Sequence, residues 1–327
     1  MAGEPILKVR DLATHFELSG GTVRATDGVD LDIEAGEILT VVGESGSGKS
    51  VTALSIMRLI APPGHIVRGQ ISLGGRDLLS LSPRAMQEVR GRAMAMVFQN
   101  PYAALHPMYR IGQQMNEAIR LNTAHKKDSR AKAIELLTRI HVEDPESVLN
   151  SYPFEVSAGI CQRVMLAIAL AARPALLIAD EPTTNLDALA QAEILGLIKE
   201  MRAAYGMSVL LITHDFGVVS TMADRVLVMY AGRPVETGPA RAILAQPAHP
   251  YAKGLIASVM NARTRARRLT QISGEAPDVM HLPPGCSFRP RCPEAFGQCE
   301  QDPPMSDRDS VHKARCWRVT AEGVGHG

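Results

Sequence analysis

Short apolar runs alternate along the chain with segments in which apolar residues recur at helical spacing. Polar residues or a glycine follow each run, and each run is long enough for one buried strand. Strands that alternate with helices predict a mostly parallel sheet, whose polar strand ends share one edge. The apolar runs are 38–42, 94–98, 175–179 and 208–212, and the main helical segments are 51–60, 111–141 and 189–205.

Other regions follow different patterns. Residues 1–35 alternate between apolar and polar positions around a Gly20-Gly21 turn, which predicts an antiparallel flank. From about residue 240 proline and glycine increase and the periodicity fades, so we expect a small loop-rich module there. Shorter elements are expected as a strand pair at 69–73 and 77–79, a hairpin at 226–230 and 233–237, a helix near 252–259 and a basic linker at 263–268.

Composition narrows the class of protein. The 327 residues are 46% hydrophobic, enough for a packed core, and the net charge is +1. Such a balance gives no electrostatic footprint for nucleic acid, so we expect no nucleic-acid partner. The N-terminus lacks the apolar segment of a signal peptide, and the longest apolar run, 164–172, is far shorter than the ~20 residues that cross a bilayer. We expect a cytosolic chain, or one attached to a membrane only through another protein.

A glycine-rich stretch between a predicted strand and a predicted helix is the main chemical signal. In that context the pattern G-x-x-x-x-G-K-[ST] indicates a phosphate-binding P-loop, because glycines let backbone N–H groups face phosphate oxygens. Lys49 would contact the β- and γ-phosphates, and the Ser50 hydroxyl would bind Mg²⁺. The expected nucleotide-binding residues here are Gly43, Glu44, Ser45, Gly46, Ser47, Gly48, Lys49, Ser50 and Val51.

Polar side chains at the ends of three other predicted strands suggest the rest of an ATP-hydrolysing site. Asp180 would hold Mg²⁺, and Glu181 would polarise the attacking water as general base. An acidic pair at a strand end is otherwise often only a helix N-cap, but the P-loop upstream favours the magnesium interpretation. His214 would reach the γ-phosphate or the water, and Gln99 would sense the metal and the water.

The order of these motifs resembles the nucleotide-binding subunit of an ABC transporter over residues 5–240. The motifs also include Ser157-Ala158-Gly159 and Asn185-Leu186-Asp187. Within that superfamily, three stretches and the cysteine-bearing tail resemble the dipeptide/oligopeptide/nickel importer ATPases. These stretches are 42–50, 178–184 and His249-Pro250-Tyr251.

The resemblance implies that two such subunits face head to tail, with each ATP between the P-loop of one and the signature of the other. Phe16, which spacing alone favours as ordinary core, would then stack on adenine. Gln99 would be the Q-loop residue near the permease and would bind Mg²⁺ with Ser50 and Asp180. Asp187 would lie in the D-loop and His214 would be the switch histidine. The signature presented to the partner's ATP would be Ser157, Ala158, Gly159 and Gln162.

The signature departs from the family pattern. The family usually has Leu-Ser-Gly-Gly, whereas this chain has Val-Ser-Ala-Gly at 156–159; Cys161 and Asn185 are also unusual at their positions. The methyl group of Ala158 restricts the backbone conformations available at a position where N–H groups approach phosphate. A tolerated variant is one interpretation. The other is asymmetry, in which the ATP site that uses this signature is slower and the partner ATPase is a different chain.

Four of the five cysteines cluster near the C-terminus, and Cys161 stands alone. In a reducing compartment such a cluster indicates metal more than disulfides. The spacing lacks the paired C-x₂-C of zinc ribbons, while four thiolates on loops can hold a [4Fe–4S] cluster. The resemblance favours iron–sulfur as a structural staple, with Zn²⁺ second and a metal-free tail third. The expected ligands are Cys286, Cys292, Cys299 and Cys316.

Together these features predict an α/β fold. It has a P-loop NTPase (RecA-like) core with an antiparallel β flank, a helical insertion subdomain and a small Cys-containing C-terminal extension. The expected domains are the ATP-binding core at 1–98 and 165–240, the helical subdomain with the signature at 99–164, and the extension at 241–327.

The expected function is an ATPase that powers import of di- or oligopeptides. The resemblance implies a second ATPase subunit, two transmembrane permease subunits and an extracytoplasmic solute-binding protein, with this chain peripheral on the cytoplasmic face of the bacterial inner membrane. Import of nickel or another small solute is an alternative. A soluble ABC ATPase is less favoured, because such proteins usually carry two ATPase units, a long coiled coil or a basic surface.

Overall fold

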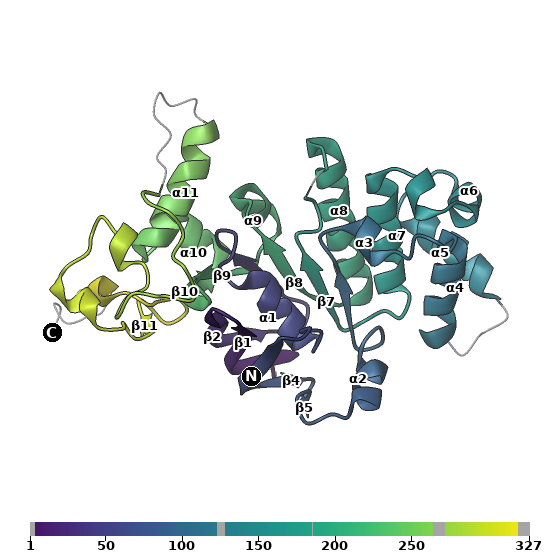
Figure 1. Ribbon diagram of the computed structural model, residues 1–327. Helices are drawn as coiled ribbons and strands as arrows, with labels where there is room; N and C mark the ends of the chain where they lie inside the picture. Colours follow the sequence, from purple (N-terminus) through teal and green to yellow (C-terminus); the bar gives the residue numbers. More distant parts are fainter. Residues whose placement is uncertain (1–3, 123–127, 185, 264–271, 320–327) are drawn as a thin grey trace. The chain divides into compact units, whose positions relative to one another are not determined.

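The computed structural model describes residues 4–122, 128–184, 186–263 and 272–319, and the chain divides into two compact units (Figure 1). The helical unit consists of 80–211 with the short segments 1–6 and 34–37. The P-loop unit consists of 7–33, 38–79 and 212–327. Both combine strands with helices, which confirms the predicted α/β class.

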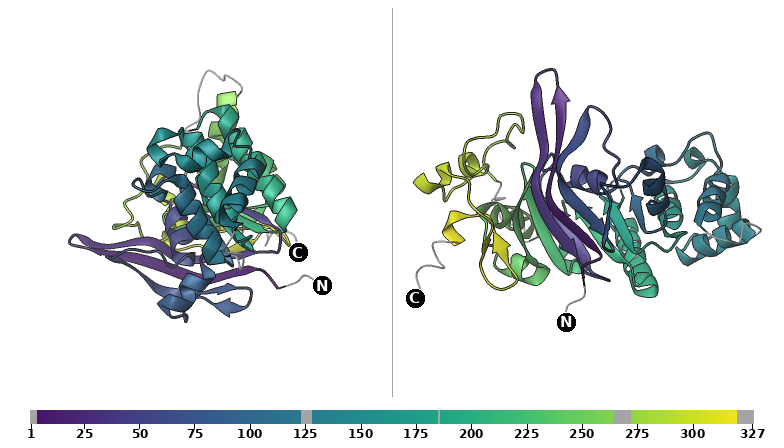
Figure 2. Two further views of the ribbon diagram at one scale, coloured as in Figure 1. Left: turned by 90° about the vertical axis from the view of Figure 1, so that its right-hand side faces the viewer. Right: turned by 90° about the horizontal axis from the view of Figure 1, so that it is seen from below.

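The P-loop unit contains the antiparallel flank that the sequence predicts. Its strands follow the order β2-β1-β4-β5, and the long β1–β2 ribbon turns just before Gly21 (Figure 2). Within the same unit β3 runs parallel to β9, and β9 pairs with β10 as an antiparallel hairpin. The elements of its N-terminal half are β1 (Leu7–Leu18), β2 (Gly21–Ile33), β3 (Ile38–Val42), α1 (Lys49–Ile56), β4 (Gly64–Leu73) and β5 (Arg76–Asp77).

The C-terminal half of this unit begins with helix α9, continues in the β9–β10 hairpin and ends in loops. Two short strands, β11 and β12, add to the free side of β10. An apolar cluster that includes Tyr230, Tyr251 and Phe288 joins the hairpin to the loops. The elements are α9 (Phe216–Met222), β9 (Arg225–Tyr230), β10 (Arg233–Pro239), α10 (Ala240–Ala245), α11 (Pro250–Arg263), η3 (Arg289–Arg291), η4 (Gly297–Glu300), β11 (Ser306–Asp307) and β12 (Lys313–Ala314).

The helical unit places a short parallel sheet beside a group of helices. Strand β7 lies between β8 and β6, and all five of its residues are buried. Short, largely apolar runs of four to six residues form these strands because both faces are covered. The elements are α2 (Pro83–Val89), β6 (Met94–Val97), α3 (Pro101–Ala104), α4 (Ile111–Asn122), α5 (Ser129–Arg139), α6 (Pro145–Asn150), η2 (Pro153–Glu155), α7 (Ala158–Leu170), β7 (Leu176–Asp180), α8 (Ala188–Tyr205) and β8 (Ser208–Thr213).

Several element bounds differ from the sequence prediction. Helix α1 begins two residues earlier than predicted and ends before Arg58, which has a φ of +51°. The segment 111–141 forms two helices, and α11 is longer than the predicted 252–259. Strand β5 covers Arg76–Asp77 instead of 77–79. Most of the predicted basic linker, 264–268, lies outside the described residues.

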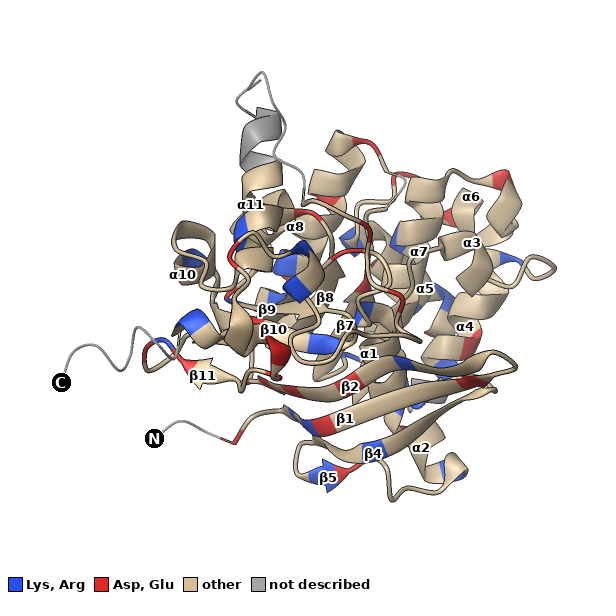
Figure 3. Cartoon of the chain, turned by 60° about the vertical axis from the view of Figure 1, so that its left-hand side comes forward, with Lys and Arg blue, Asp and Glu red and all other residues tan. Residues whose placement is uncertain are grey.

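The distribution of charged residues fits the net charge of +1. Lys and Arg are interspersed with Asp and Glu along the chain (Figure 3). Among the described residues, no helix combines the length and the apolar character that spanning a bilayer requires.

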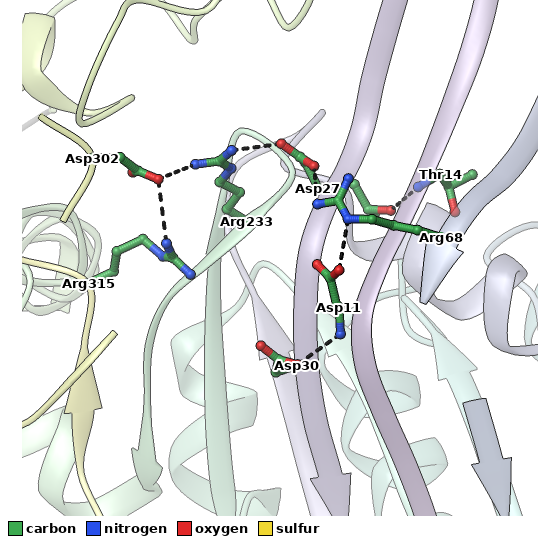
Figure 4. Close-up of polar contacts among 9 residues, drawn as sticks. Asp11, Thr14, Asp27, Asp30, Arg68, Arg233, Asp302 and Arg315 are labelled. Carbon is green, nitrogen blue, oxygen red and sulfur yellow. Dashed lines mark hydrogen bonds and ion pairs between the residues drawn. The ribbon is translucent and has the colours of Figure 1, made fainter. Parts of the chain in front are cut away.

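A chain of ion pairs ties the antiparallel flank to the C-terminal loops of the P-loop unit (Figure 4). Asp27 on β2 is 7% exposed and accepts hydrogen bonds of 2.7 Å from both Arg68 and Arg233. Arg68 also pairs with Asp11 at 2.9 Å, and Arg233 pairs with Asp302 at 2.8 Å. Asp27 is therefore the carboxylate at the centre of this series of ion pairs.

We expect Asp27→Asn to lower the free energy of unfolding by about 2 kcal/mol at neutral pH, because two arginines lose a shared, mostly buried carboxylate. Burial opposes the ionisation of Asp27, but hydrogen bonds from Arg233 and Arg68 outweigh it and lower the pKa below the ordinary 3.8. Because the pKa of Asp27 is lower in the folded state, the ionised carboxylate stabilises the fold at pH values above the ordinary pKa of 3.8. This contribution is lost as the pH falls through the folded-state pKa.

Urea unfolding of both proteins at neutral pH and at about pH 3 measures this difference, which should shrink in acid. Asp30→Asn is the control. Asp30 is an exposed carboxylate on the same strand, and its Oδ1 accepts a hydrogen bond from the backbone N–H of Asp11. Equal stability of wild type and Asp27→Asn at neutral pH would contradict the expectation.

Candidate functional site

The loop at 43–48 follows β3 in the P-loop unit, and its backbone passes very close to two other segments. A Cβ atom at Gly43, where φ is +156°, would lie 2.3 Å from the carbonyl oxygen of Met229. At Gly48, where φ is +99°, it would lie 2.5 Å from the carbonyl oxygen of Ala25. Any side chain at these positions would force the backbones apart, so the course of the loop requires glycine.

The turn between β9 and β10 supports this loop through backbone hydrogen bonds. The Gly232 N–H donates to the carbonyl of Ser47 at 3.0 Å, and the Gly232 carbonyl accepts from the Asp27 N–H at 2.9 Å. Ala231 and Gly232 both have positive φ, at +47° and +80°, as a tight hairpin turn requires. The hairpin predicted from the sequence thus connects the glycine-rich loop to the antiparallel flank.

Helix α1 begins at Lys49, directly after the left-handed Gly48, and no side chain caps its N-terminus. Lys49 is 5% exposed, and its Nζ donates to the carbonyls of Gly43 at 2.8 Å and Glu44 at 2.9 Å. Ser45 and Gly46 at the tip of the loop are exposed. An uncapped helix N-terminus beside a held ammonium group favours an anion such as phosphate.

In the helical unit, the acidic pair lies at the end of β7. Asp180 is 7% exposed, and Glu181 has a φ of +46°, which is uncommon outside glycine and often marks a functional site. Glu181 Oε2 accepts hydrogen bonds from Gln99 Nε2 at 3.0 Å and from Thr184 Oγ1 at 2.9 Å. The structure therefore brings together Gln99 and Glu181, two predicted catalytic residues that lie 82 positions apart.

The signature stretch forms the start of α7. Ser157 is the N-cap, and its Oγ accepts the N–H of Ile160 at 3.3 Å. Ala158 is the first helical residue and has no positive φ, so its backbone has a conformation that alanine adopts readily. Gln162, which was expected to face the partner's ATP, is only 2% exposed. The predicted asymmetry of the two ATP sites remains a prediction.

The remaining predicted residues lie at element ends or on the flank. Phe16 on β1 is half-buried against Gly64, where a Cβ atom would lie 2.4 Å from its ring. His214 directly follows β8 and is exposed. Asp187 caps α8 by accepting the N–H groups of Leu189 and Ala190, each at 3.0 Å. Asn185 lies outside the described residues.

The predicted site residues divide between the two units. The glycine-rich loop, Phe16 and His214 belong to the P-loop unit. Gln99, the acidic pair, the signature and Asp187 belong to the helical unit.

All four C-terminal cysteines line one small cavity in the P-loop unit, as their clustering in sequence predicts. Burial raises the pKa of Cys292 to about 11 and also raises the pKa of Cys286 and Cys316. Among the described residues, however, no three His, Cys, Asp or Glu side chains are arranged so that they could hold a metal ion. The predicted iron–sulfur or zinc site is therefore not supported by this arrangement.

Sequence reasoning missed three residues that contact the predicted site. Thr184 holds Glu181 and lies three residues after it, a spacing that favours such a contact. Tyr251 belongs to the His-Pro-Tyr stretch, and its hydroxyl accepts the Glu44 N–H at 2.8 Å. Arg291 pairs with the Glu44 carboxylate across 247 positions, and no pattern in the sequence indicates that contact.

Comparisons with known proteins agree with this arrangement. Residues 26–184 match the model of the family described as ABC transporter, and 235–299 match that described as oligopeptide/dipeptide transporter, C-terminal region. The oligopeptide transport ATP-binding protein OppD of Bacillus subtilis is 45% identical over 95% of this chain and 88% of its own length. The dipeptide transport ATP-binding protein DppD of the same organism is 43% identical over 96% and 95%.

A solved structure is similar as well. The ATP-binding cassette MJ0796, in a dimeric post-hydrolysis state bound to ADP and Pi, is 25% identical to this chain. The similarity covers 72% of this chain and 99% of that one, with a TM-score of 0.65.

We expect Cys161 to resist alkylation in the folded protein. It is fully buried, its Sγ donates to the Pro153 carbonyl at 3.3 Å, and burial raises its pKa to about 11. The thiolate is the reactive form, so little of it is present at about pH 8. Mass spectrometry after iodoacetamide treatment should find Cys161 unmodified in the native chain and modified in denaturant. Equal labelling in both conditions would show that the helical unit opens at this residue.

Proposed function

Because this chain belongs to the ABC transporter ATPases that carry the oligopeptide/dipeptide C-terminal region, we propose that it hydrolyses ATP to drive import of di- or oligopeptides. The peptide substrate is supported by relatives whose printed names are oligopeptide and dipeptide transport ATP-binding proteins. These relatives are similar over almost the whole chain, including the C-terminal region.

The observation that carries hydrolysis is the position of Glu181. It follows Asp180 at the end of a buried strand, and two donors orient its carboxylate. In the proposed mechanism the glycine-rich loop and Lys49 bind the phosphates, and Glu181 accepts the proton of the attacking water. Mg²⁺ would neutralise phosphate charge when bound. The side chains that would hold it are Ser50, Asp180 and Gln99.

The proposed assembly contains more than this chain. A second ATPase subunit would place its signature over the ATP bound here, while Ser157 and Gly159 would face the ATP of that subunit. Two permease subunits would carry the peptide, delivered by an extracytoplasmic solute-binding protein. This chain would lie peripherally on the cytoplasmic face of the bacterial inner membrane. The support for this arrangement is family membership together with the dimeric state of the similar cassette.

Uptake of a radiolabelled dipeptide by proteoliposomes that contain the whole transporter tests the proposed function. We expect uptake only with ATP inside the liposome and binding protein outside. ATP-dependent uptake of nickel without uptake of peptide would replace the peptide assignment by the metal alternative.

Glu181→Gln should retain ATP binding and lose most hydrolysis, because the variant removes the base and leaves the phosphate-binding loop unchanged. A drop of about a hundredfold or more in turnover in the assembled transporter is expected for a general base. Equilibrium binding of ATP and phosphate release, measured on the same preparation, separate the two effects. Undiminished hydrolysis would show that another group is the base.

Thr184→Val should lower turnover by roughly tenfold or less, because Glu181 loses the hydroxyl that donates to its Oε2 at 2.9 Å. The variant keeps the shape of the side chain. Thr183→Val is the matched control, since it removes the neighbouring hydroxyl. Steady-state phosphate release at saturating ATP is the measurement, and equal loss in both variants would argue against a specific role for Thr184.

The iron–sulfur cluster expected at the four clustered cysteines stays a prediction, because the described side chains are not arranged to hold a metal ion. Its basis is the donor set: four thiols line one cavity, and three of them, Cys286, Cys292 and Cys299, lie in the region that matches the oligopeptide/dipeptide transporter C-terminal model. Iron and acid-labile sulfide, measured after anaerobic purification, should be present in near-equal amounts and absent from Cys292→Ser. Zinc in their place would assign the site to zinc, and absence of both metals would leave a metal-free tail.

A further inference from the structure

Two residues of the C-terminal extension hold the glycine-rich loop at Glu44. Arg291 Nη1 donates to Glu44 Oε2 at 2.7 Å, and Nη2 donates to Oε1 at 3.0 Å. This two-bond geometry is the strong form of an arginine–carboxylate pair. On the backbone of the same residue, the Glu44 N–H donates to the Tyr251 hydroxyl at 2.8 Å. Glu44 is thus fixed through both its side chain and its main chain.

Arg291 is itself held firmly. Its side chain is 7% exposed, and its Nε donates to the Ser273 carbonyl at 3.0 Å. The guanidinium carbon lies 5.8 Å from the centre of the Tyr230 ring and 6.0 Å from that of Phe288. An arginine with so many partners loses little further freedom when it binds a carboxylate. Its position is set by the short helix η3, one residue before Cys292.

Tyr251 is also surrounded by protein. It is fully buried at the start of α11, with its ring centre 4.6 Å from that of Tyr230. The Tyr251 N–H donates to His249 Nδ1 at 3.0 Å, which orients the first turn of the helix. The hydroxyl therefore accepts the loop N–H from a fixed position.

Glu44 connects these contacts to the part of the loop that is expected to bind phosphate. Its carbonyl accepts from the Lys49 ammonium at 2.9 Å, so a shift of Glu44 would also shift a partner of Lys49. Its carboxylate, in addition, puts a negative charge on a loop expected to bind a multiply charged anion. Unless that charge is neutralised, it repels the phosphates. Arg291 is the cation that pairs with it.

We propose that Arg291 and Tyr251 are positioning residues for ATP, through which the C-terminal extension sets the shape and the charge of the P-loop at Glu44. The inference rests on the proposed use of this loop as the ATP site. Arg291 neutralises the Glu44 carboxylate, and Tyr251 fixes the Glu44 backbone. The extension is therefore part of the nucleotide site as well as an appendage to it.

Binding of ATP with Mg²⁺ to the full-length chain, measured by isothermal titration calorimetry, tests the proposal. Arg291→Gln should weaken binding by about tenfold, equivalent to about 1.4 kcal/mol, because the Glu44 carboxylate is left unpaired. Adding Glu44→Gln to that variant should restore affinity to within about threefold of wild type, because the two changes are coupled through one ion pair. A role confined to structural support would give no such recovery.

Tyr251→Phe separates the backbone contact from the charge. It should weaken ATP binding by about fivefold, the scale of one hydrogen bond, because the Glu44 N–H loses its acceptor. Adding Glu44→Gln should give no recovery here, since the side-chain charge is not involved. Arg289→Gln is the control for both variants, because Arg289 lies in the same short helix and pairs with Glu300 outside the loop.

Lys49→Ala distinguishes failure of the inference from failure of the proposed function. If Lys49→Ala abolishes binding while Arg291→Gln and Tyr251→Phe bind ATP as wild type does, the extension has no positioning role. If Lys49→Ala binds ATP normally, the assignment of the loop itself is wrong. Should Arg291→Gln fail to fold, Arg291→Lys replaces it. Lysine keeps the charge without the two-bond geometry, so wild-type affinity in that folded variant would overturn the proposed geometry and a loss of a few fold would support it.

Discussion

The close approach of three backbones at the glycine-rich loop is the constraint on which the rest of the P-loop unit depends. Gly43 passes the carbonyl of Met229 and Gly48 passes that of Ala25, at separations that leave no room for a Cβ atom. The loop is consequently packed against strand β9 at Gly43 and against strand β2 at Gly48. Its N–H groups and Lys49 keep their orientation because those neighbours are themselves parts of sheets.

The C-terminal extension also contacts the glycine-rich loop. The β9–β10 turn contacts the loop through Gly232, and the residues that follow supply Tyr251 and Arg291 to Glu44. Arg233 and Asp302 add a second connection, which reaches Asp27 on the antiparallel flank. The region that matches the oligopeptide/dipeptide transporter C-terminal model thus has a physical connection to the loop that the ABC transporter model covers. This gives a reason for the two regions to occur together in one chain.

Local patterns predicted most of the fold. The apolar runs identified β3, β6, β7 and β8 because buried strands need apolar residues on both faces. Gly20-Gly21 and Ala231-Gly232 identified the hairpins through their turn chemistry. Gln99 and Glu181 were both predicted at the ends of strands in a mostly parallel sheet, and the structure adds the hydrogen bond between them. Conformations that depend on distant neighbours were not predictable, such as the positive φ of Glu181 or the early start of α1.

Contacts between residues far apart in the sequence could not be predicted from the sequence either. Nothing near Arg291 indicates that it would meet Glu44, since that contact depends on how the loops after α11 pack on Tyr230. Clustering of the four cysteines was predictable from their spacing. A metal among them was not, because ligation depends on distances between thiols that spacing does not set.

ATP hydrolysis by the transporter assembled with its permease and second ATPase tests the central claim most directly. The rate should be compared with binding protein that is empty, peptide-loaded or nickel-loaded. This account predicts stimulation by the peptide-loaded form alone. Stimulation by the nickel-loaded form alone, or full activity of this chain without any membrane partner, would contradict it.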